Sequence, residues 1–276
     1  MGVINRSVSV ESICLMEAAH LVRRSIKYWH LIGKMYLESL RDHHPAQVFR
    51  AAYFFCRHID DVLDGDRKVT ADPEMYVRHI LSAMKTGHRG PQIVDLYRFA
   101  IDSMKEMAAE TDRPMSYFMR VIEDAMLFDF ERGKERRVLT RTELESYYNN
   151  TFTPITDIAL IISGSHLRTE HIPEIVTTQG HIYTVRDMKK DLEKGIINIP
   201  LEELEKAEID GVSASYNNVR RNPMLASWMD DEVRIYQHQL QILKGKLSDE
   251  GSRKVVLPLI WQMDMYCKLY QLGLQK

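Results

Sequence analysis

Two segments of the chain carry a pair of aspartates at helical spacing. Asp60 and Asp64 lie in the stretch AAYFFCRHIDDVLDGD, and Asp187 and Asp191 lie in QGHIYTVRDMKKDLEKGIINIP. The members of each pair are four residues apart, so on a helix both carboxylates share one face. Like charges so placed repel each other, and burial adds to the cost. A divalent cation between the carboxylates would remove both penalties.

Apolar residues lead into each pair along the same helix face, which distinguishes these pairs from an ordinary solvated acidic face. Magnesium prefers oxygen ligands, usually one or two carboxylates together with water and phosphate oxygens. We therefore expect two opposed helices to hold Mg²⁺, with Mn²⁺ as the alternative ion, against a diphosphate. The cations would neutralise this leaving group as an allylic carbon–oxygen bond breaks. Aromatic rings could then stabilise the allylic cation, and the candidates are Tyr53, Tyr147, Tyr183 and Tyr266.

The elements that must position these residues are all predicted to be helices. No run of useful length alternates with period two, so strands are not expected. Thr140 and Glu143 have the spacing of a capping box at a helix start. The polar segment 201–223 is expected to lie outside the main bundle. Periodicity and Gly or Pro breaks predict helices near 8–40, 45–64, 73–86, 91–110, 115–132, 141–164, 172–194, 213–246 and 252–274.

Composition narrows the classes of function. The 276 residues are 45% hydrophobic and have a net charge of −2, which does not fit a general nucleic-acid binder. No linker of low complexity interrupts the chain, so we expect one domain over 1–276. Three scattered cysteines without a CxxC motif indicate reduced thiols and a cytoplasmic protein. With no signal peptide and no membrane-spanning run, we expect at most peripheral membrane contact, through a lipid substrate.

The two motifs resemble those of the squalene/phytoene synthase family of isoprenyl transferases. YFFCRHIDDVLDGD is similar to the first aspartate-rich motif, Y-x-x-C-R-x-x-D-D-x-x-D, and RDMKKDLEKGIINIP to the second, R-D-x-x-x-D-x-x-x-G-R-x-Y-x-P. The resemblance extends over nearly the full chain. It implies an all-α isoprenoid-synthase bundle around a central cavity, with prenyl diphosphates as substrates. It also implies metal binding by the four aspartates and diphosphate contacts from Arg57 and Arg186. Tyr53 and Tyr266 match cavity tyrosines of the family, and Tyr147, a further substrate-binding candidate, matches the tyrosine before the family's V-A-G-x-V-G stretch.

Several positions depart from the family pattern around the expected cavity. The V-A-G-x-V-G stretch is replaced by residues 151–156, which include Phe152. Two positions of the Q-x-x-N segment hold Gly180 and Tyr183, and the Arg and Tyr after the second motif become Ile196 and Asn198. Ionisation of a prenyl diphosphate needs the metal ligands, and these are present. Head-to-head coupling also needs a second prenyl site, which the changed residues would shape.

Three functions therefore stay open. The first is head-to-head condensation of two prenyl diphosphates, and the second keeps the ionisation but transfers the cation to a non-prenyl acceptor, such as an aromatic ring, or cyclises it. The third is a helical scaffold without activity, which retention of all four aspartates disfavours. Chain length, NADPH dependence and oligomeric state cannot be predicted from these residues. His58 is expected on the helix surface. Asp129 is also expected on the surface, and the alternative is that it supports the floor of the cavity.

Overall fold

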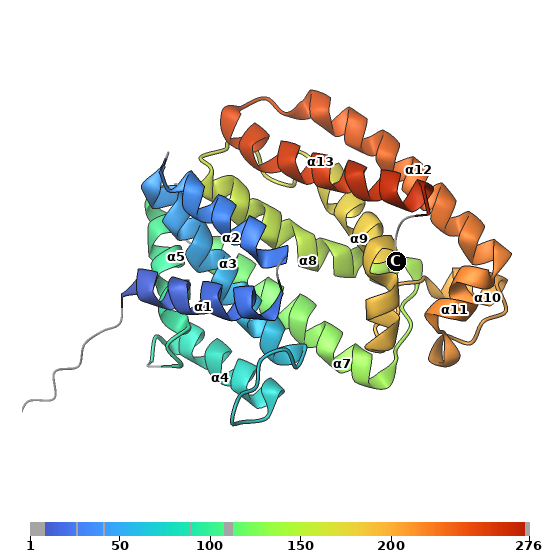
Figure 1. Ribbon diagram of the computed structural model, residues 1–276, viewed down its shortest axis with the longest axis horizontal. Coiled ribbons are helices and arrows are strands. Elements are labelled where there is room, and N and C mark those ends of the chain that lie inside the picture. The colour runs from blue at the N-terminus through green and yellow to red at the C-terminus, as the bar shows by residue number, and fades with distance from the viewer. Residues whose placement is uncertain (1–8, 26, 41, 89, 108–112, 274–276) are drawn as a thin grey trace, which may run out of the picture. The chain divides into compact units, whose positions relative to one another are not determined.

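The computed structural model describes residues 9–25, 27–40, 42–88, 90–107 and 113–273, and every regular element in them is a helix (Figure 1). The only β-type pairing within this part of the chain is an isolated parallel bridge between Val138 and Ile197. The all-α prediction is therefore confirmed. The chain divides into two compact units, Met1–Ile122 and Glu123–Lys276.

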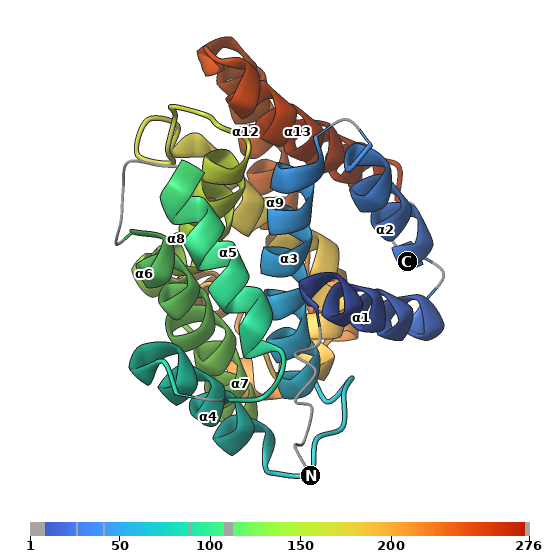
Figure 2. The same ribbon diagram turned by 90° about the vertical axis from the view of Figure 1, so that its left-hand side faces the viewer.

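The central helix of the first unit is α3, which carries the first aspartate pair. It packs against α1, α2, α4 and α5 (Figure 2). Where one helix was predicted over 8–40, there are two, because Ser25 is extended (φ −157°, ψ 135°) and ends α1. The helices are α1 Val10–Arg24, α2 Lys27–Glu38, α3 His43–Leu63, α4 Pro73–Thr86, α5 Val94–Met107 and α6 Arg113–Arg120.

The central helix of the second unit is α9, which carries the second pair and packs against α8, α11, α12 and α13. The helix predicted near 115–132 is observed as α6, a π-helix over Val121–Leu127 that contains the boundary between the units, and α7. The remaining helices are α7 Phe128–Glu135, α8 Arg141–Ile162, α9 Glu174–Glu193, α10 Leu201–Lys206, α11 Tyr216–Arg221, α12 Pro223–Lys246 and α13 Glu250–Gln271.

Local signals in the sequence explain several helix starts. The predicted capping box is confirmed at α8: the Thr140 hydroxyl accepts from the Glu143 backbone N–H at 3.3 Å, and the Glu143 carboxylate accepts from the Thr140 N–H at 2.9 Å. Pro223 opens α12 at the first helical position, where its missing N–H costs nothing. It separates α12 from α11, so the helix predicted over 213–246 is also divided.

The segment 201–223 does not lie outside the bundle, contrary to prediction. Leu204 and Val219 are fully buried, and Ala214 is 2% exposed, all within the hydrophobic core of the second unit. The segment is polar on average, yet a few apolar residues anchor its two short helices. In the described part of the chain, no helix combines the length and apolar character needed to cross a membrane.

Candidate functional site

The first aspartate pair lies on a half-exposed stripe of α3. Tyr53, Arg57, Asp60 and Asp64 follow one another at spacings of three or four residues, and each is partly accessible, whereas the rest of this half of α3 is mostly buried. Asp64 is the C-cap, with its backbone N–H bonded to the Asp60 carbonyl oxygen at 2.8 Å. The last three turns of α3 thus bring the predicted residues of the first motif onto one face.

Arg57 bridges two neighbouring carboxylates at this turn. It donates to Asp60 Oδ2 at 2.6 Å, and its other terminal nitrogen lies 2.6 Å from Asp61 Oδ1. Burial acts to lower the pKa of Arg57, but the Asp60 and Asp61 carboxylates raise it above its usual value overall. Arg57 therefore remains a cation, as the expected contact with a diphosphate requires.

Asp61, which the sequence analysis did not single out, is a buried anchor for these arginines. Its side chain is 1% exposed, and Arg24 from α1 also donates to its Oδ1, at 2.5 Å. Arg24 pairs in addition with Asp66 after the helix. The consecutive aspartates therefore differ in exposure: Asp60 is partly accessible, and Asp61 is buried and pairs with the guanidinium groups of Arg24 and Arg57.

His58 is buried, so the prediction of a helix-surface position is wrong. Its Nδ1 lies 3.2 Å from Glu17 Oε1 on α1, and its Nε2 lies 3.1 Å from the Tyr76 hydroxyl on α4. Arg67 also pairs with Glu17, at 2.5 Å. His58 thus belongs to a polar network that ties α3 to α1 and α4, on a different side of the helix from the aspartate pair.

The second aspartate pair lies on a similar half-exposed stripe of α9. Tyr183, Arg186, Asp187 and Asp191 are the partly accessible members, and Asp187 is 36% exposed at its side chain. Arg186 donates through both Nε, at 2.8 Å, and Nη2 to the adjacent Asp187 carboxylate. Each motif therefore presents an arginine and two carboxylates on the last turns of the central helix of its unit.

Arg186 is held between two aromatic rings. Its guanidinium carbon lies 4.2 Å from the Tyr183 ring centroid and 4.9 Å from that of Tyr266 on α13. Gln262 bridges the two hydroxyls, accepting from Tyr183 at 3.4 Å and donating to Tyr266 at 2.9 Å. Burial raises the pKa of Tyr183 to about 12, so the ring stays neutral. Phe152 packs edge-on against Tyr183, at a centroid separation of 5.7 Å.

Asp191 is a carboxylate whose pKa is raised by its surroundings. Burial, followed by the nearby charges of Asp187 and Asp129, raises its pKa to about 7, while a hydrogen bond from Asn198 opposes the shift. The Asn198 amide nitrogen lies 3.1 Å from Asp191 Oδ2. A carboxylate with this surplus of negative neighbours would gain stability from a cation.

Tyr147 and Asp129 form a polar contact inside the second unit. The Tyr147 hydroxyl donates to Asp129 Oδ2, and Arg132 donates from Nε to Asp129 Oδ1 at 2.7 Å. The Asp129 side chain is 25% exposed, between a surface position and a buried one, and its carboxylate is held by these two contacts. Burial and the Asp129 charge raise the pKa of Tyr147 well above its usual value.

The donor sets fit Mg²⁺ or Mn²⁺ in their chemistry. Each helix offers two carboxylates four residues apart, and such hard oxygen donors suit these ions. Within the described residues, no group of three or more His, Cys, Asp or Glu side chains forms a ready-made metal site. The carboxylates of either helix would therefore need water or substrate oxygens to complete a coordination shell.

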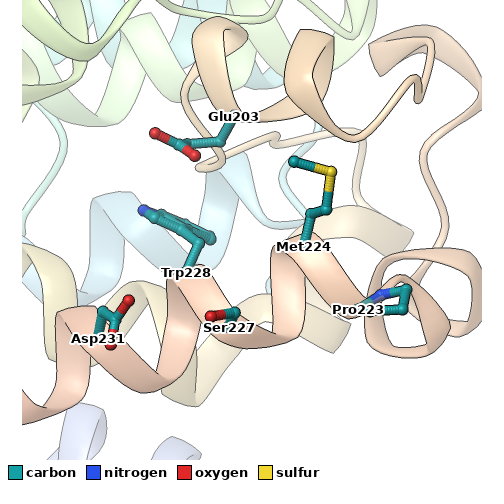
Figure 3. Close-up of a pocket in the computed structure, with 6 residues that line it drawn as sticks. All are labelled: Glu203, Pro223, Met224, Ser227, Trp228 and Asp231. Atoms are coloured by element: carbon teal, nitrogen blue, oxygen red, sulfur yellow. The ribbon is translucent and has the colours of Figure 1, made fainter.

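A surface pocket of about 490 Å³ lies elsewhere in the second unit, between α10 and α12 (Figure 3). Its Glu203 faces Trp228, but Glu203 is already paired with Arg141, at 2.9 Å. None of the residues predicted for the site lines it, so we assign it no part in the chemistry. The lining residues are Glu203, Pro223, Met224, Ser227, Trp228 and Asp231.

Comparison with known proteins now identifies the class. Residues 43–271 match the squalene/phytoene synthase family, and the chain belongs to that family. Its members are prenyltransferases of isoprenoid biosynthesis that act on prenyl diphosphates and use divalent metal ions, and head-to-head condensation is the activity at family level.

A solved structure supports the fold. The chain is similar to the squalene synthase HpnC from Alicyclobacillus acidocaldarius, with a TM-score of 0.64, 19% sequence identity and coverage of 97% of each chain. At this identity the likeness establishes the all-α isoprenoid-synthase fold. A comparison with curated proteins finds no match.

Proposed function

We propose that the protein is a magnesium-dependent prenyltransferase that ionises a prenyl diphosphate and condenses it head-to-head with a second prenyl diphosphate. The observation that carries the proposal is the repeated arrangement on α3 and α9. In a member of this family, each helix presents one arginine and two carboxylates on a half-exposed stripe. Magnesium ions held by these carboxylates would neutralise the departing diphosphate.

The roles of the chain's own residues follow from their contacts. Arg57 and Arg186 would bind diphosphate oxygens, because both are cations at the edge of their helices. Tyr183 and Tyr266 hold the Arg186 guanidinium between their rings and so orient it. Tyr53, whose pKa burial raises, would stay neutral and offer an aromatic face to a carbocation. Tyr147 would contact the substrate from the interior of the second unit, where its hydroxyl donates to Asp129.

One observation favours the alternative of a non-prenyl acceptor or a cyclised product. The Tyr148 ring lies over Gly180, where a Cβ atom would come within 2.3 Å of its Cγ, and it contacts Phe152. Phe152 in turn contacts Tyr183. Phe152 and Tyr183 are bulky rings at positions where this chain departs from the family pattern, and they would reduce the room for a second prenyl chain. The cytoplasmic location expected from the three free thiols is likewise part of the proposal.

The metal assignment is tested by Asp60→Asn and Asp187→Asn. Each variant should lose diphosphate release by about 100-fold or more while keeping the wild-type circular dichroism spectrum, because one metal ligand is lost from an accessible position. The assay is diphosphate release with Mg²⁺ and geranyl, farnesyl or geranylgeranyl diphosphate. Undiminished turnover in either variant would refute the assignment.

Mass spectrometry of the same reactions separates the two functions. A hydrocarbon with two prenyl units would establish head-to-head coupling. Release of diphosphate with only a prenyl alcohol or a single-unit terpene would favour the alternative, and candidate aromatic acceptors would then be added. No release with any of the three substrates would count against both functions for these chain lengths.

A further inference from the structure

Asp191 receives support from a residue outside the helix that carries it. Asn198 lies in the loop after α9, and its Nδ2 donates to Asp191 Oδ2 at 3.1 Å. The other end of the same amide accepts from Arg132 Nη2 at 2.5 Å. A guanidinium has only donors, so it must face the amide oxygen. Arg132 therefore fixes which way Asn198 points, and the amide N–H group is directed at Asp191.

Arg132 is itself immobilised inside the second unit. Its side chain is 1% exposed and bonds Asp129 at 2.7 Å through Nε and the Ile197 carbonyl oxygen at 3.3 Å through Nη1. Its guanidinium carbon also lies 4.6 Å from the Tyr147 ring centroid. Burial acts to lower the pKa of Arg132, but the Asp129 carboxylate raises it above its usual value overall. The arginine is thus a cation held in place by an ion pair with Asp129 and by a backbone carbonyl oxygen, which keeps its Nη2 at Asn198.

This chain of contacts orients Asp191 without placing the Arg132 guanidinium on its carboxylate. Arg132 bonds the neutral amide of Asn198, and this amide in turn donates to the carboxylate. Asp191 differs in this from Asp60 and Asp187, which are bonded directly by Arg57 and Arg186. A neutral donor adds no positive charge of its own and restricts the carboxylate to one orientation, which is how residues behind a metal ligand commonly act.

We infer that Asn198 is a positioning residue for Asp191, held by Arg132 and Asp129, and that it sets the affinity of the second aspartate pair for a divalent cation. The inference rests on the proposed function, because it takes Asp191 to be a metal ligand. Neither Asn198 nor Arg132 was assigned a role from the sequence, and the family pattern has a different residue at the position of Asn198.

The test compares Asn198→Ala with a matched control, Asn217→Ala, which removes an exposed amide on α11. Binding of Mn²⁺ in the presence of inorganic diphosphate is followed by electron paramagnetic resonance, and unfolding by circular dichroism. Asn198→Ala should weaken Mn²⁺ binding by about 10-fold or more, as losses behind a metal ligand do, while the control matches wild type. In steady-state assays the Mg²⁺ concentration for half-maximal rate should rise in parallel.

A double-mutant cycle tests whether Asn198 acts through Asp191. In the Asp191→Asn background, Asn198→Ala should cause no further loss of Mn²⁺ affinity. The inference would be overturned if Asn198→Ala bound Mn²⁺ as tightly as wild type, or if it failed to fold. It would also be overturned if Asn198→Ala weakened Mn²⁺ binding as much in the Asp191→Asn background as in wild type. If Asp191→Asn itself leaves Mn²⁺ binding unchanged, the metal assignment of the proposed function fails as well.

Discussion

Asp60 and Asp61 follow each other in the chain, yet their side chains have different surroundings. The Asp60 side chain is 36% exposed and pairs with Arg57, whereas that of Asp61 is 1% exposed and pairs with both Arg57 and Arg24. An exposed ion pair contributes about 0–1 kcal/mol to stability. Breaking a buried pair by removing one partner is much more costly, because the remaining charges stay behind. Substitution of Asp61 should therefore lower stability, and substitution of Asp60 should lower activity.

We predict that Asp61→Asn lowers the free energy of unfolding by about 3 kcal/mol. Asp60→Asn should change it by less than about 1 kcal/mol and instead abolish diphosphate release. Urea unfolding followed by circular dichroism measures the first effect, and the diphosphate assay the second. A fully stable Asp61→Asn protein would show that Arg24 and Arg57 do not depend on this carboxylate.

At the scale of helices, the contact between α8 and α9 depends on the absence of a side chain at residue 180. A Cβ atom there would lie 2.3 Å from Tyr148 Cγ, whereas at Gly245, on α12, it would meet nothing within 4 Å. Overpacking of this kind typically costs about 1–3 kcal/mol. By contrast, Gly→Ala at an open helical position is neutral or stabilising by up to about 1 kcal/mol.

Gly180→Ala should therefore lower the free energy of unfolding by about 1–3 kcal/mol, and Gly245→Ala should not lower it. In a Tyr148→Ala background the clash is absent, so Gly180→Ala should cost little there. Thermal unfolding of the four proteins of this cycle, with Gly245→Ala as the control, measures the coupling. Equal costs of Gly180→Ala with and without the Tyr148 ring would contradict the packing described.

At the start of α13, Asp249 is expected to make the stability of the fold depend on pH in the acid range. Asp249 is its N-cap, accepting from the Ser252 N–H at 2.7 Å and from the Ser165 hydroxyl at 3.0 Å. Burial acts to raise the pKa of Asp249, but these hydrogen bonds lower it below its usual value overall. With the folded pKa below the unfolded one, the stabilisation is present at neutral pH. It is lost as the pH falls below about 4, where the unfolded chain takes up the proton first.

Asp249→Ala should lower the free energy of unfolding by about 1 kcal/mol at pH 7, the usual effect of losing a cap. Asp249→Asn keeps a capping oxygen, so its stability at pH 7 should stay closer to wild type and should fall less between pH 5 and pH 3. Urea titrations over this range, with wild type in parallel, provide the comparison. Identical pH profiles for wild type and Asp249→Asn would remove Asp249 from the acid response.

At the scale of the whole molecule, the fold and both aspartate stripes could be predicted from the sequence, but most of the polar contacts around them could not. Helical periodicity is local, and so is the alignment of Asp60 with Asp64 or Asp187 with Asp191. By contrast, Arg24 bonds Asp61 from another helix, which the local sequence cannot predict. The sequence of α3 likewise does not reveal that α1 and α4 cover the side that carries His58, so the prediction of a surface position was wrong. Long-range pairing needs tertiary structure.

Two features of the whole chain bear on its organisation. The family match over 43–271 includes parts of both compact units, so both units belong to the matched family region. A single domain over 1–276 stays a prediction. Helix α1 precedes the matched region, yet it supplies Arg24 and Glu17 to the network beneath the first motif. The site's support therefore extends beyond the segment by which the family is identified.

The loop that presents Asn198 also places a constraint on how this protein can diverge. Gly195 has a φ of +81°, and a Cβ on it would lie 2.3 Å from the Gly133 carbonyl oxygen, while a Cβ on Gly133 would press on the Lys194 carbonyl oxygen at 3.1 Å. A side chain at Gly195 is therefore strained while the segment around Gly133 keeps its path, and one at Gly133 needs the Lys194 carbonyl group to shift. Among descendants of a common ancestor, we expect the two glycines to be inherited together and, where one is replaced, the loop to be rebuilt.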